Sequence, residues 1–227
     1  MTLANAKRLI SQIASTLRLP GYFVDRAHRL YSLALQKNFV FGRRLHHVLA
    51  TALYTICRQE KSAHLLIDFS DALQTNIFVL GHCFLALQQL LCLKLPVVDP
   101  SLYIHRFAAR LELGDKVGQV STTALRLITR MKKDWMVLGR RPDAVCAAGM
   151  LIACRSHGFD KHVSDMAEVF RVAISTLRRR LVEFQQTPAA QLTVEQFHIY
   201  DAAVELDPPA YIKQQLVSIL YSEMIMM

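Results

Sequence analysis

The sequence has little glycine and proline and lacks a long apolar run without polar interruptions. Its 227 residues include 8 Gly and 7 Pro, and 52% of them are hydrophobic. This composition excludes a disordered tail and favours a compact chain. The most apolar segment, residues 77 to 98, is interrupted by His82 and Lys94, and the first residues lack the apolar stretch of a signal peptide. We therefore expect neither a membrane span nor a secretory signal.

Paired cysteines are also missing. The five cysteines are odd in number, form no Cys-x-x-Cys pair and lie within apolar helical patterns: Cys57, Cys83, Cys92, Cys146 and Cys154. This pattern predicts a reduced, intracellular protein with thiols in its core. His46 and His47 have no second Cys or His cluster at ligand spacing, so we expect no metal site.

Signatures of catalysis are absent as well. The sequence contains no phosphate-binding glycine loop, no His-Glu-x-x-His and no Gly-x-Ser-x-Gly. We expect a protein that is not an enzyme and that needs no cofactor.

Acidic residues are scarce relative to basic ones. The 27 Lys and Arg exceed the 18 Asp and Glu, which gives a net charge of +9. Residues 1–100 hold 11 basic and 5 acidic side chains and residues 101–190 hold 15 and 8, whereas residues 191–227 hold 1 and 5. The basic character thus belongs to the body of the chain, and a polyanion is the first partner to expect.

The apolar pattern predicts an all-α protein, because apolar residues recur at helical spacing almost throughout and no convincing alternating strand occurs. Pro96 and Pro100 bracket a short linker. We expect a first domain at 1–95, a linker at 96–101, a second domain at 102–190 and an acidic C-terminal extension at 191–227.

An internal duplication is visible when the chain is shifted by 97 residues. Residues 42–89 then align with 139–186 without a gap, and twelve positions are identical: Gly42/Gly139, Arg43/Arg140, Arg44/Arg141, Val48/Val145, Ala50/Ala147, Cys57/Cys154, Arg58/Arg155, Asp68/Asp165, Ile77/Ile174, Leu80/Leu177, Gln88/Gln185 and Gln89/Gln186. Because a solenoid repeat is only about 20–50 residues long, we predict two copies of one independent helical domain. Asp68 and Asp165 occupy equivalent places, which favours a structural or capping role over a single catalytic pair.

The stretch after each Gly-Arg-Arg is apolar nearly all round, which is typical of a helix surrounded by other helices. In the second copy, Ala147, Ala148 and Gly149 would let neighbouring helices approach closely, and Pro142 suits a first helical turn. We predict a central helix ringed by four others in each copy.

Residues 163–186 have the rhythm of a helix-turn-helix. We predict a short helix with Met166, Ala167 and Phe170 inward, a tight turn at residues 171–173 and a second helix from about Ile174. On the second helix, one face should meet the core: Ile174, Leu177, Leu181 and Phe184. The opposite face should be exposed: Ser175, Arg179, Val182 and Gln186, with Arg178 on its flank.

The exposed arginines of that helix suit DNA. A guanidinium can bind guanine O6 and N7 in the major groove, and Arg180, nearer the core edge, is better placed for a phosphate. We predict DNA contacts from a set of positions in the second copy: Arg171, Ser175, Arg178, Arg179, Arg180, Arg140 and Arg141. A solvated charged face remains the alternative, and Ala173 stands where a capping side chain is common.

The aligned helix of the first copy has a different surface. Ser175 and the three arginines correspond there to Phe78, Gly81, His82 and Cys83. An exposed Phe78 suits a protein partner or the other repeat, and burial between the domains is equally compatible. Arg43 and Arg44 lie at the N-terminal end of a helix, where the helix dipole disfavours cations. We therefore predict that they also bind a partner, with ordinary solubility as the alternative.

Several motifs of the second half resemble a known family: Tyr103-Ile104-His105-Arg106-Phe107-Ala108, Trp135, Gly139-Arg140-Arg141-Pro142, Leu151-Ile152-Ala153, Arg155-x-His157-Gly158-Phe159, Glu183-Phe184-x-x-Thr187-Pro188, Leu192-Thr193 through Phe197, and Asp207-Pro208-Pro209-x-Tyr211. With the two repeats, the chain resembles the cyclin-fold core of transcription factor IIB and, more closely, the IIB-related subunit of transcription factor IIIB. The resemblance covers roughly residues 4–211.

This resemblance implies two cyclin-like five-helix repeats in a nuclear transcription initiation factor. Such a factor binds the TATA-binding protein and flanking promoter DNA and connects them to RNA polymerase III, and its base-facing positions correspond here to Ser175 and Arg178. The family's zinc ribbon has no counterpart in the sequence, so zinc binding is not implied. We expect a core fragment or a shortened variant of the family.

Two other classes fit part of the pattern. A true cyclin would use its first repeat to regulate a kinase, but it would not need an arginine-rich helix in the second. A helix-turn-helix repressor would be expected to dimerise and bind an effector.

Overall fold

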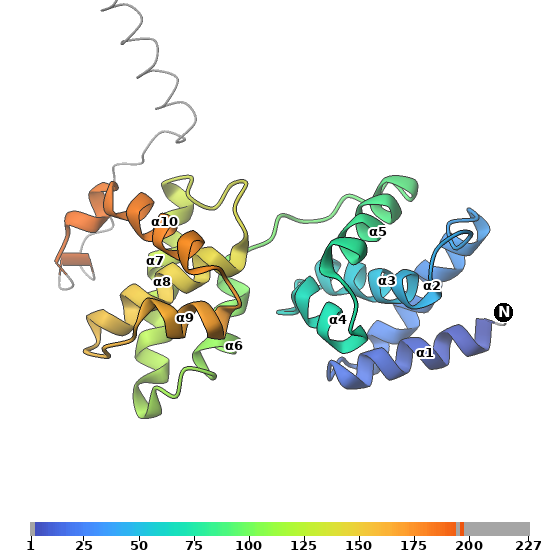
Figure 1. The fold of residues 1–227 in the computed structure, drawn as a ribbon, viewed down its shortest axis with the longest axis horizontal. Helices are drawn as coiled ribbons and strands as arrows, with labels where there is room; N and C mark the ends of the chain where they lie inside the picture. Colours follow the sequence, from blue (N-terminus) through green and yellow to red (C-terminus); the bar gives the residue numbers. More distant parts are fainter. Residues whose placement is uncertain (1–2, 194–195, 198–227) are drawn as a thin grey trace, which may run out of the picture. The chain divides into compact units, whose positions relative to one another are not determined.

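The computed structural model describes residues 3–193 and 196–197, and the chain divides into two compact units, Met1–Val98 and Asp99 onward (Figure 1). Within the described ranges, the regular structure consists of α-helices and short 3₁₀ helices, without a strand. The predicted all-α fold is confirmed. The helices of those ranges include none with both the length and the apolar content for a membrane crossing.

The first unit is built around one buried helix. Its five helices are α1 (Leu3–Thr16), α2 (Gly21–Gln36), α3 (Leu45–Gln59), α4 (Leu66–Leu73) and α5 (Ile77–Leu90). The other four pack against α3. Ten consecutive residues of α3, from Val48 to Cys57, are buried. This helix is therefore the predicted central helix.

The second unit repeats this plan. Its elements are η1 (Pro100–Tyr103), α6 (Ile104–Ala108), η2 (Gly114–Lys116), α7 (Val117–Lys133), α8 (Pro142–Ser156), α9 (Val163–Phe170), α10 (Ile174–Gln185) and η3 (Pro188–Gln191). Helix α8 is central and contacts α6, α7, α9 and α10. A Cβ on Gly149 would lie 3.2 Å from Ile128 Cγ1, so this glycine allows α7 to approach closely.

The backbone repeats with the shift seen in the sequence. Helices α3 and α8 begin and end at positions 97 residues apart, and so do α4 and α9. The left-handed residues correspond as well: Gly42 (φ 73°) to Gly139 (φ 67°), and Gln74 (φ 50°) to Arg171 (φ 54°). The identical residues thus accompany a closely similar path of the chain, with left-handed residues at equivalent turns.

Residues 99–101 were expected to belong to a linker, and the structure makes that linker shorter. Lys132 Nζ donates to Asp99 Oδ2 at 2.5 Å, and Cys146 Sγ donates to the carbonyl oxygen of Pro100 at 3.0 Å. Both contacts tie these residues to α7 and α8 of the second unit. Of the expected extension at 191–227, only residues 191–193 and 196–197 are described.

Four of the five thiols are buried, as predicted: Cys57, Cys83, Cys146 and Cys154. The prediction is wrong for Cys92, which is exposed. Cys92 lies shortly after the end of α5 and has a left-handed backbone conformation (φ 49°). Its side chain therefore leaves the apolar face of the helix, although the sequence pattern predicted that this face continues through Cys92. In the part of the chain that the structure describes, no three His, Cys, Asp or Glu side chains gather as a metal site.

Candidate nucleic-acid interface

A helix-turn-helix stands at the predicted place in the second unit. Helix α9 ends at Phe170, three residues form the turn, and α10 begins at Ile174. Met166, Ala167 and Phe170 are buried, and the Phe170 ring stacks on Phe107 with ring centroids 4.1 Å apart. The exposed Arg171 makes the turn in a left-handed conformation.

The outward face of α10 and its C-cap residue carry the side chains predicted to be exposed. Ser175, Arg179, Val182 and Gln186 are exposed, and so is Arg178 beside them. The prediction for the inward face is wrong at Ile174, which is 41% exposed. Ile174 is the first residue of the helix, so its side chain lies at the rim of the unit, whereas Leu177 and Phe184 further along are buried.

Arg180 does not have the place predicted for it. Its side chain is buried, with 5% of the residue exposed, because position 180 lies between Leu177 and Phe184 on the core side of α10. Arg180 Nη1 lies 2.6 Å from Glu183 Oε2. Burial lowers the pKa of Arg180, and the Glu183 carboxylate opposes this change. The guanidinium is therefore a buried ion-pair partner and is not presented to a phosphate.

Glu183 also connects α10 to the Gly-Arg-Arg turn before α8. Arg140 Nη2 lies 3.3 Å from Glu183 Oε1, so the carboxylate stands between Arg140 and Arg180. The Arg140 side chain remains 36% exposed despite this contact. Arg141 is exposed at the N-cap of α8. Together, Arg140, Arg141, Arg178 and Arg179 form what we call the second-repeat basic surface.

The first unit presents a different surface on the helix equivalent to α10. Phe78 is 67% exposed on α5, and Val79 and Leu85 are exposed beside it on the same helix. His82 takes the place of Arg179 and is exposed, and Gly81 takes the place of Arg178. The exposure predicted for Phe78 is thus found, on a helix without a Lys or Arg residue.

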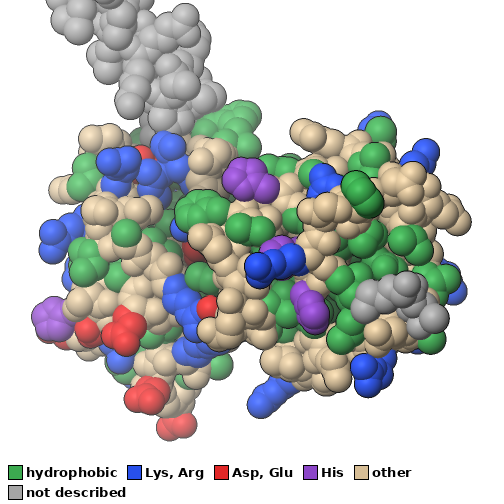
Figure 2. Space-filling view, turned by 45° about the vertical axis from the view of Figure 1, so that its right-hand side comes forward, with side chains coloured by type: hydrophobic (Ala, Val, Ile, Leu, Met, Phe, Trp, Pro, Cys, Tyr) green, Lys and Arg blue, Asp and Glu red, His purple; other side chains and the backbone are tan. Residues whose placement is uncertain are grey.

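The two units differ in the acidic side chains that they display on one face. On the face shown in Figure 2, the described residues of the first unit, on the right, show Lys, Arg and His side chains but no Asp or Glu. The second unit shows acidic side chains among its basic ones on the same face. Two cations of the first unit nevertheless have carboxylate partners, Lys7 with Asp25 and Arg26 with Glu60.

The first Gly-Arg-Arg turn borders a groove that sequence reasoning missed. Arg43 Nη1 donates to the carbonyl oxygen of Phe39 at 2.7 Å, and its guanidinium lies 4.1 Å from the centre of the Phe39 ring. Arg44 is exposed. The groove has a volume of about 450 Å³ and is lined by residues of the turn and of α5: Lys37, Asn38, Phe39, Arg43, Ala86, Gln89 and Leu90.

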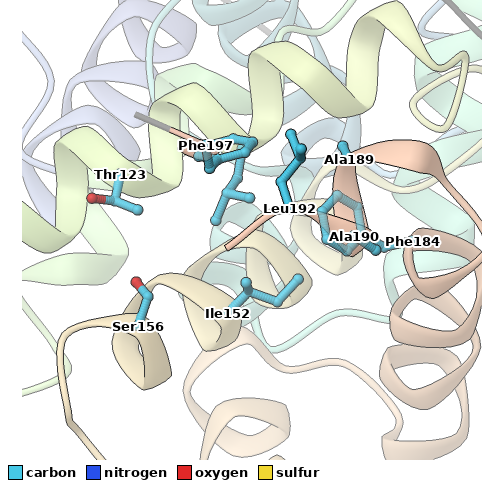
Figure 3. Close-up of a pocket in the computed structure, with 9 residues that line it drawn as sticks. Thr123, Ile152, Ser156, Phe184, Ala189, Ala190, Leu192 and Phe197 are labelled. Atoms are coloured by element: carbon cyan, nitrogen blue, oxygen red, sulfur yellow. The ribbon is translucent and has the colours of Figure 1, made fainter. Parts of the chain in front are cut away.

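A small apolar cavity of about 100 Å³ lies in the second unit (Figure 3). Leu192 and Phe197, which follow η3, line it with Phe184 of α10. Its two hydroxyl groups are engaged within the protein: Thr123 Oγ1 is 2.8 Å from His157 Nε2, and Ser156 Oγ donates to the carbonyl oxygen of Ala153. The cavity therefore presents no free polar group to a ligand and is best explained as a packing gap.

Comparison with known proteins matches both units to one family. The family described as "Transcription factor TFIIB repeat" matches residues 1–90 and 93–187. The chain is 46% identical over 210 residues to the transcription factor IIIB 90 kDa subunit of Homo sapiens. This alignment covers 92% of this chain and 31% of that protein.

Two yeast proteins match a comparable share of this chain. The transcription factor IIIB 60 kDa subunit of Schizosaccharomyces pombe is 43% identical over 95% of this chain and 44% of its own length. The 70 kDa subunit of Saccharomyces cerevisiae is 42% identical over 94% of this chain and 36% of its own length. The chain thus spans between about a third and less than half of these relatives.

Proposed function

The chain belongs to the transcription factor TFIIB repeat family, and from this premise we propose that it is a non-enzymatic transcription initiation factor that acts in the nucleus. Its role is to bind the TATA-binding protein together with flanking promoter DNA and to connect them to RNA polymerase III. The relatives named as transcription factor IIIB subunits support this assignment.

The observation that carries the proposal is the exposed arginine face of α10. Arg178 and Arg179 project from the second helix of a helix-turn-helix, the element that enters the major groove in such motifs. Ser175 lies one turn earlier on the exposed side and supplies a hydroxyl for a base edge or phosphate. Arg140 and Arg141 add cations near the same helix for the DNA backbone, and Arg171 adds one at the turn.

The first repeat supplies the protein contact in this proposal. Arg43, Arg44 and Phe78 present cations and an exposed aromatic ring, which suit a protein surface better than a base edge. These residues would contact the TATA-binding protein while the second repeat contacts DNA.

Two weak contacts on one chain explain how binding becomes selective. The few arginines of the second-repeat basic surface provide non-specific DNA binding in the range of about 10⁻⁴–10⁻⁶ M. Linking that contact to a second one through the same chain raises the overall affinity by about 10²–10⁴. The chain should therefore bind a complex of the TATA-binding protein on DNA far more tightly than either component.

A titration tests this mechanism. A labelled promoter duplex is titrated with the chain at fixed salt, with and without saturating TATA-binding protein, and the affinity is expected to rise by at least about tenfold in its presence. Equal affinities in the two series would refute joint recognition. A duplex without a TATA element serves as the control and should show no such increase.

A further inference from the structure

The two repeats differ at one position next to the Gly-Arg-Arg turn. Glu183 of the second repeat aligns with Ala86 of the first, while Arg140 aligns with Arg43. In the second repeat the Glu183 carboxylate lies against Arg140. In the first repeat the methyl group of Ala86 leaves the same place open, and Ala86 lines the groove of about 450 Å³.

The groove is cationic at one end and apolar along its wall. Arg43 and Lys37 are exposed, and neither forms an ion pair with another described residue. The residues that line the groove include no Asp or Glu, and its apolar surface comes from Ala86 and the 39% exposed Leu90, because the Phe39 ring is buried. The hydrogen bond to Phe39 and the stacking on its ring hold the Arg43 guanidinium in one orientation, with its remaining N–H groups available.

We propose that this groove of the first repeat binds an acidic segment of a partner protein. A carboxylate of the partner takes the place beside Arg43 that Glu183 takes beside Arg140, and an adjoining apolar side chain packs against Ala86 and Leu90. Charge complementarity and the carboxylate already present in the equivalent site of the second repeat identify this ligand. The inference rests on the partner-binding role proposed for Arg43 and narrows it to one chemistry.

A nucleic-acid phosphate fits this groove less well. A phosphate chain offers no aliphatic side chain to cover Ala86 and the exposed Leu90. Arginine pairs with carboxylate and with phosphate alike through two parallel hydrogen bonds, so the apolar contact is what distinguishes the two ligands here.

The test uses the full chain and a fluorescein-labelled peptide of twelve residues in which Asp and Glu alternate with Leu and Phe. Fluorescence anisotropy at fixed salt, without DNA, should show saturable binding. A matched peptide with Asn and Gln in place of the acids should bind at least about tenfold more weakly, because the loss of one charged hydrogen-bonded pair is expected to change affinity by that order. No binding of the acidic peptide, or equal binding of both peptides, would overturn the proposal.

Two variants address the groove itself. Ala86→Glu should recreate the second repeat's ion pair with Arg43 and thereby weaken peptide binding at least about fivefold, while Ala86→Gln, of the same size but neutral, should weaken it less. Arg43→Gln should weaken binding as much as Ala86→Glu, with helical content checked by circular dichroism. Unchanged binding by both Ala86→Glu and Arg43→Gln would place the peptide elsewhere and overturn the assignment.

A final arm separates the proposal from its alternatives. Short duplex DNA is added as a competitor; if it displaces the peptide from the chain, and Ala86→Glu weakens DNA binding equally, the groove is a nucleic-acid site and the proposal is wrong. Because this assay contains no TATA-binding protein and no promoter, its outcome is independent of the promoter titration.

Discussion

Helices α5 and α10 occupy the same place in the two repeats and show how a duplicated fold acquires two different surfaces. Leu80 and Leu177 are identical at the aligned buried position, and both are fully buried. On the outer side, Gly81 and His82 of α5 stand where α10 carries Arg178 and Arg179. The contrast teaches that the core positions hold the helix in place, whereas the outer positions are free to select a partner.

The starts of the two helices differ as well. Asn76 precedes α5, and its Oδ1 accepts a hydrogen bond from the Phe78 backbone N–H at 2.8 Å. Ala173 precedes α10 with nearly the same backbone conformation but no side chain that can cap. Helix α5 of the first repeat thus has a side-chain N-cap that α10 of the second repeat lacks.

The largest expected effect tests what the repeats share. Ala147→Asp and Ala50→Asp each place a carboxylate where the wild-type residue is at most 1% exposed. An unpaired buried charge costs several kcal/mol, comparable to the whole stability of a domain, so each variant should fail to fold its repeat. Circular dichroism melting of the full chain measures this; a cooperative wild-type melt of either variant would show that its helix is not central.

The next effect tests where the repeats differ. Arg178→Ala combined with Arg179→Ala should weaken promoter binding at least about tenfold, because each lost base or phosphate contact is worth about 1–3 kcal/mol. Stability should change by less than about 0.5 kcal/mol, since both side chains are exposed. His82→Ala, at the equivalent place in α5, is the control and should leave gel-shift affinity unchanged. A double variant that binds the promoter as the wild type does would remove α10 from the interface.

A smaller effect concerns Glu183. Replacement by Ala leaves Arg180 buried without its carboxylate, and the Glu183 side chain is itself only 26% exposed. We expect a loss of about 1–3 kcal/mol in unfolding free energy. Adding Arg180→Met should recover most of it, because the uncompensated charge is then gone.

Trp135, the single tryptophan, lies in the second repeat, and its fluorescence during urea unfolding reports this stability. No recovery in the Glu183→Ala, Arg180→Met double variant would indicate that Glu183 acts mainly through Arg140.

The smallest expected effect comes from exchanging the N-cap residues of α5 and α10. Asn76→Ala should lower the stability of the first repeat by about 1 kcal/mol, and Ala173→Asn should raise that of the second by about 0.5–1 kcal/mol. The exchange is possible because Ala173 (φ −62°, ψ 137°) and Asn76 (φ −61°, ψ 126°) have the extended conformation that a capping residue needs. Urea titrations of the two single variants measure both signs; a loss of stability in Ala173→Asn would contradict the cap comparison.

Sequence reasoning located most of the candidate interface but misplaced two side chains. The turn at residues 171–173 and the exposure of Arg178 and Arg179 follow from helical periodicity, which depends only on local geometry. Arg180 was placed wrongly because the same periodicity also puts it against the core, and its charge is accommodated there by Glu183. Ile174 was placed wrongly because a first helical residue lies at the edge of the unit, where the core does not reach.

The sequence by itself determined the duplication, the all-α class and the central helices, because identities spaced 97 residues apart and apolar residues at helical spacing record them directly. Only the tertiary structure decided which cations have a carboxylate partner. Arg140 and Arg43 are identical in the alignment, yet one meets the carboxylate of Glu183 and the other borders an open groove. The physical reason is that the state of a charge depends on its neighbours in space, and those neighbours come from a helix more than 40 residues away in the chain.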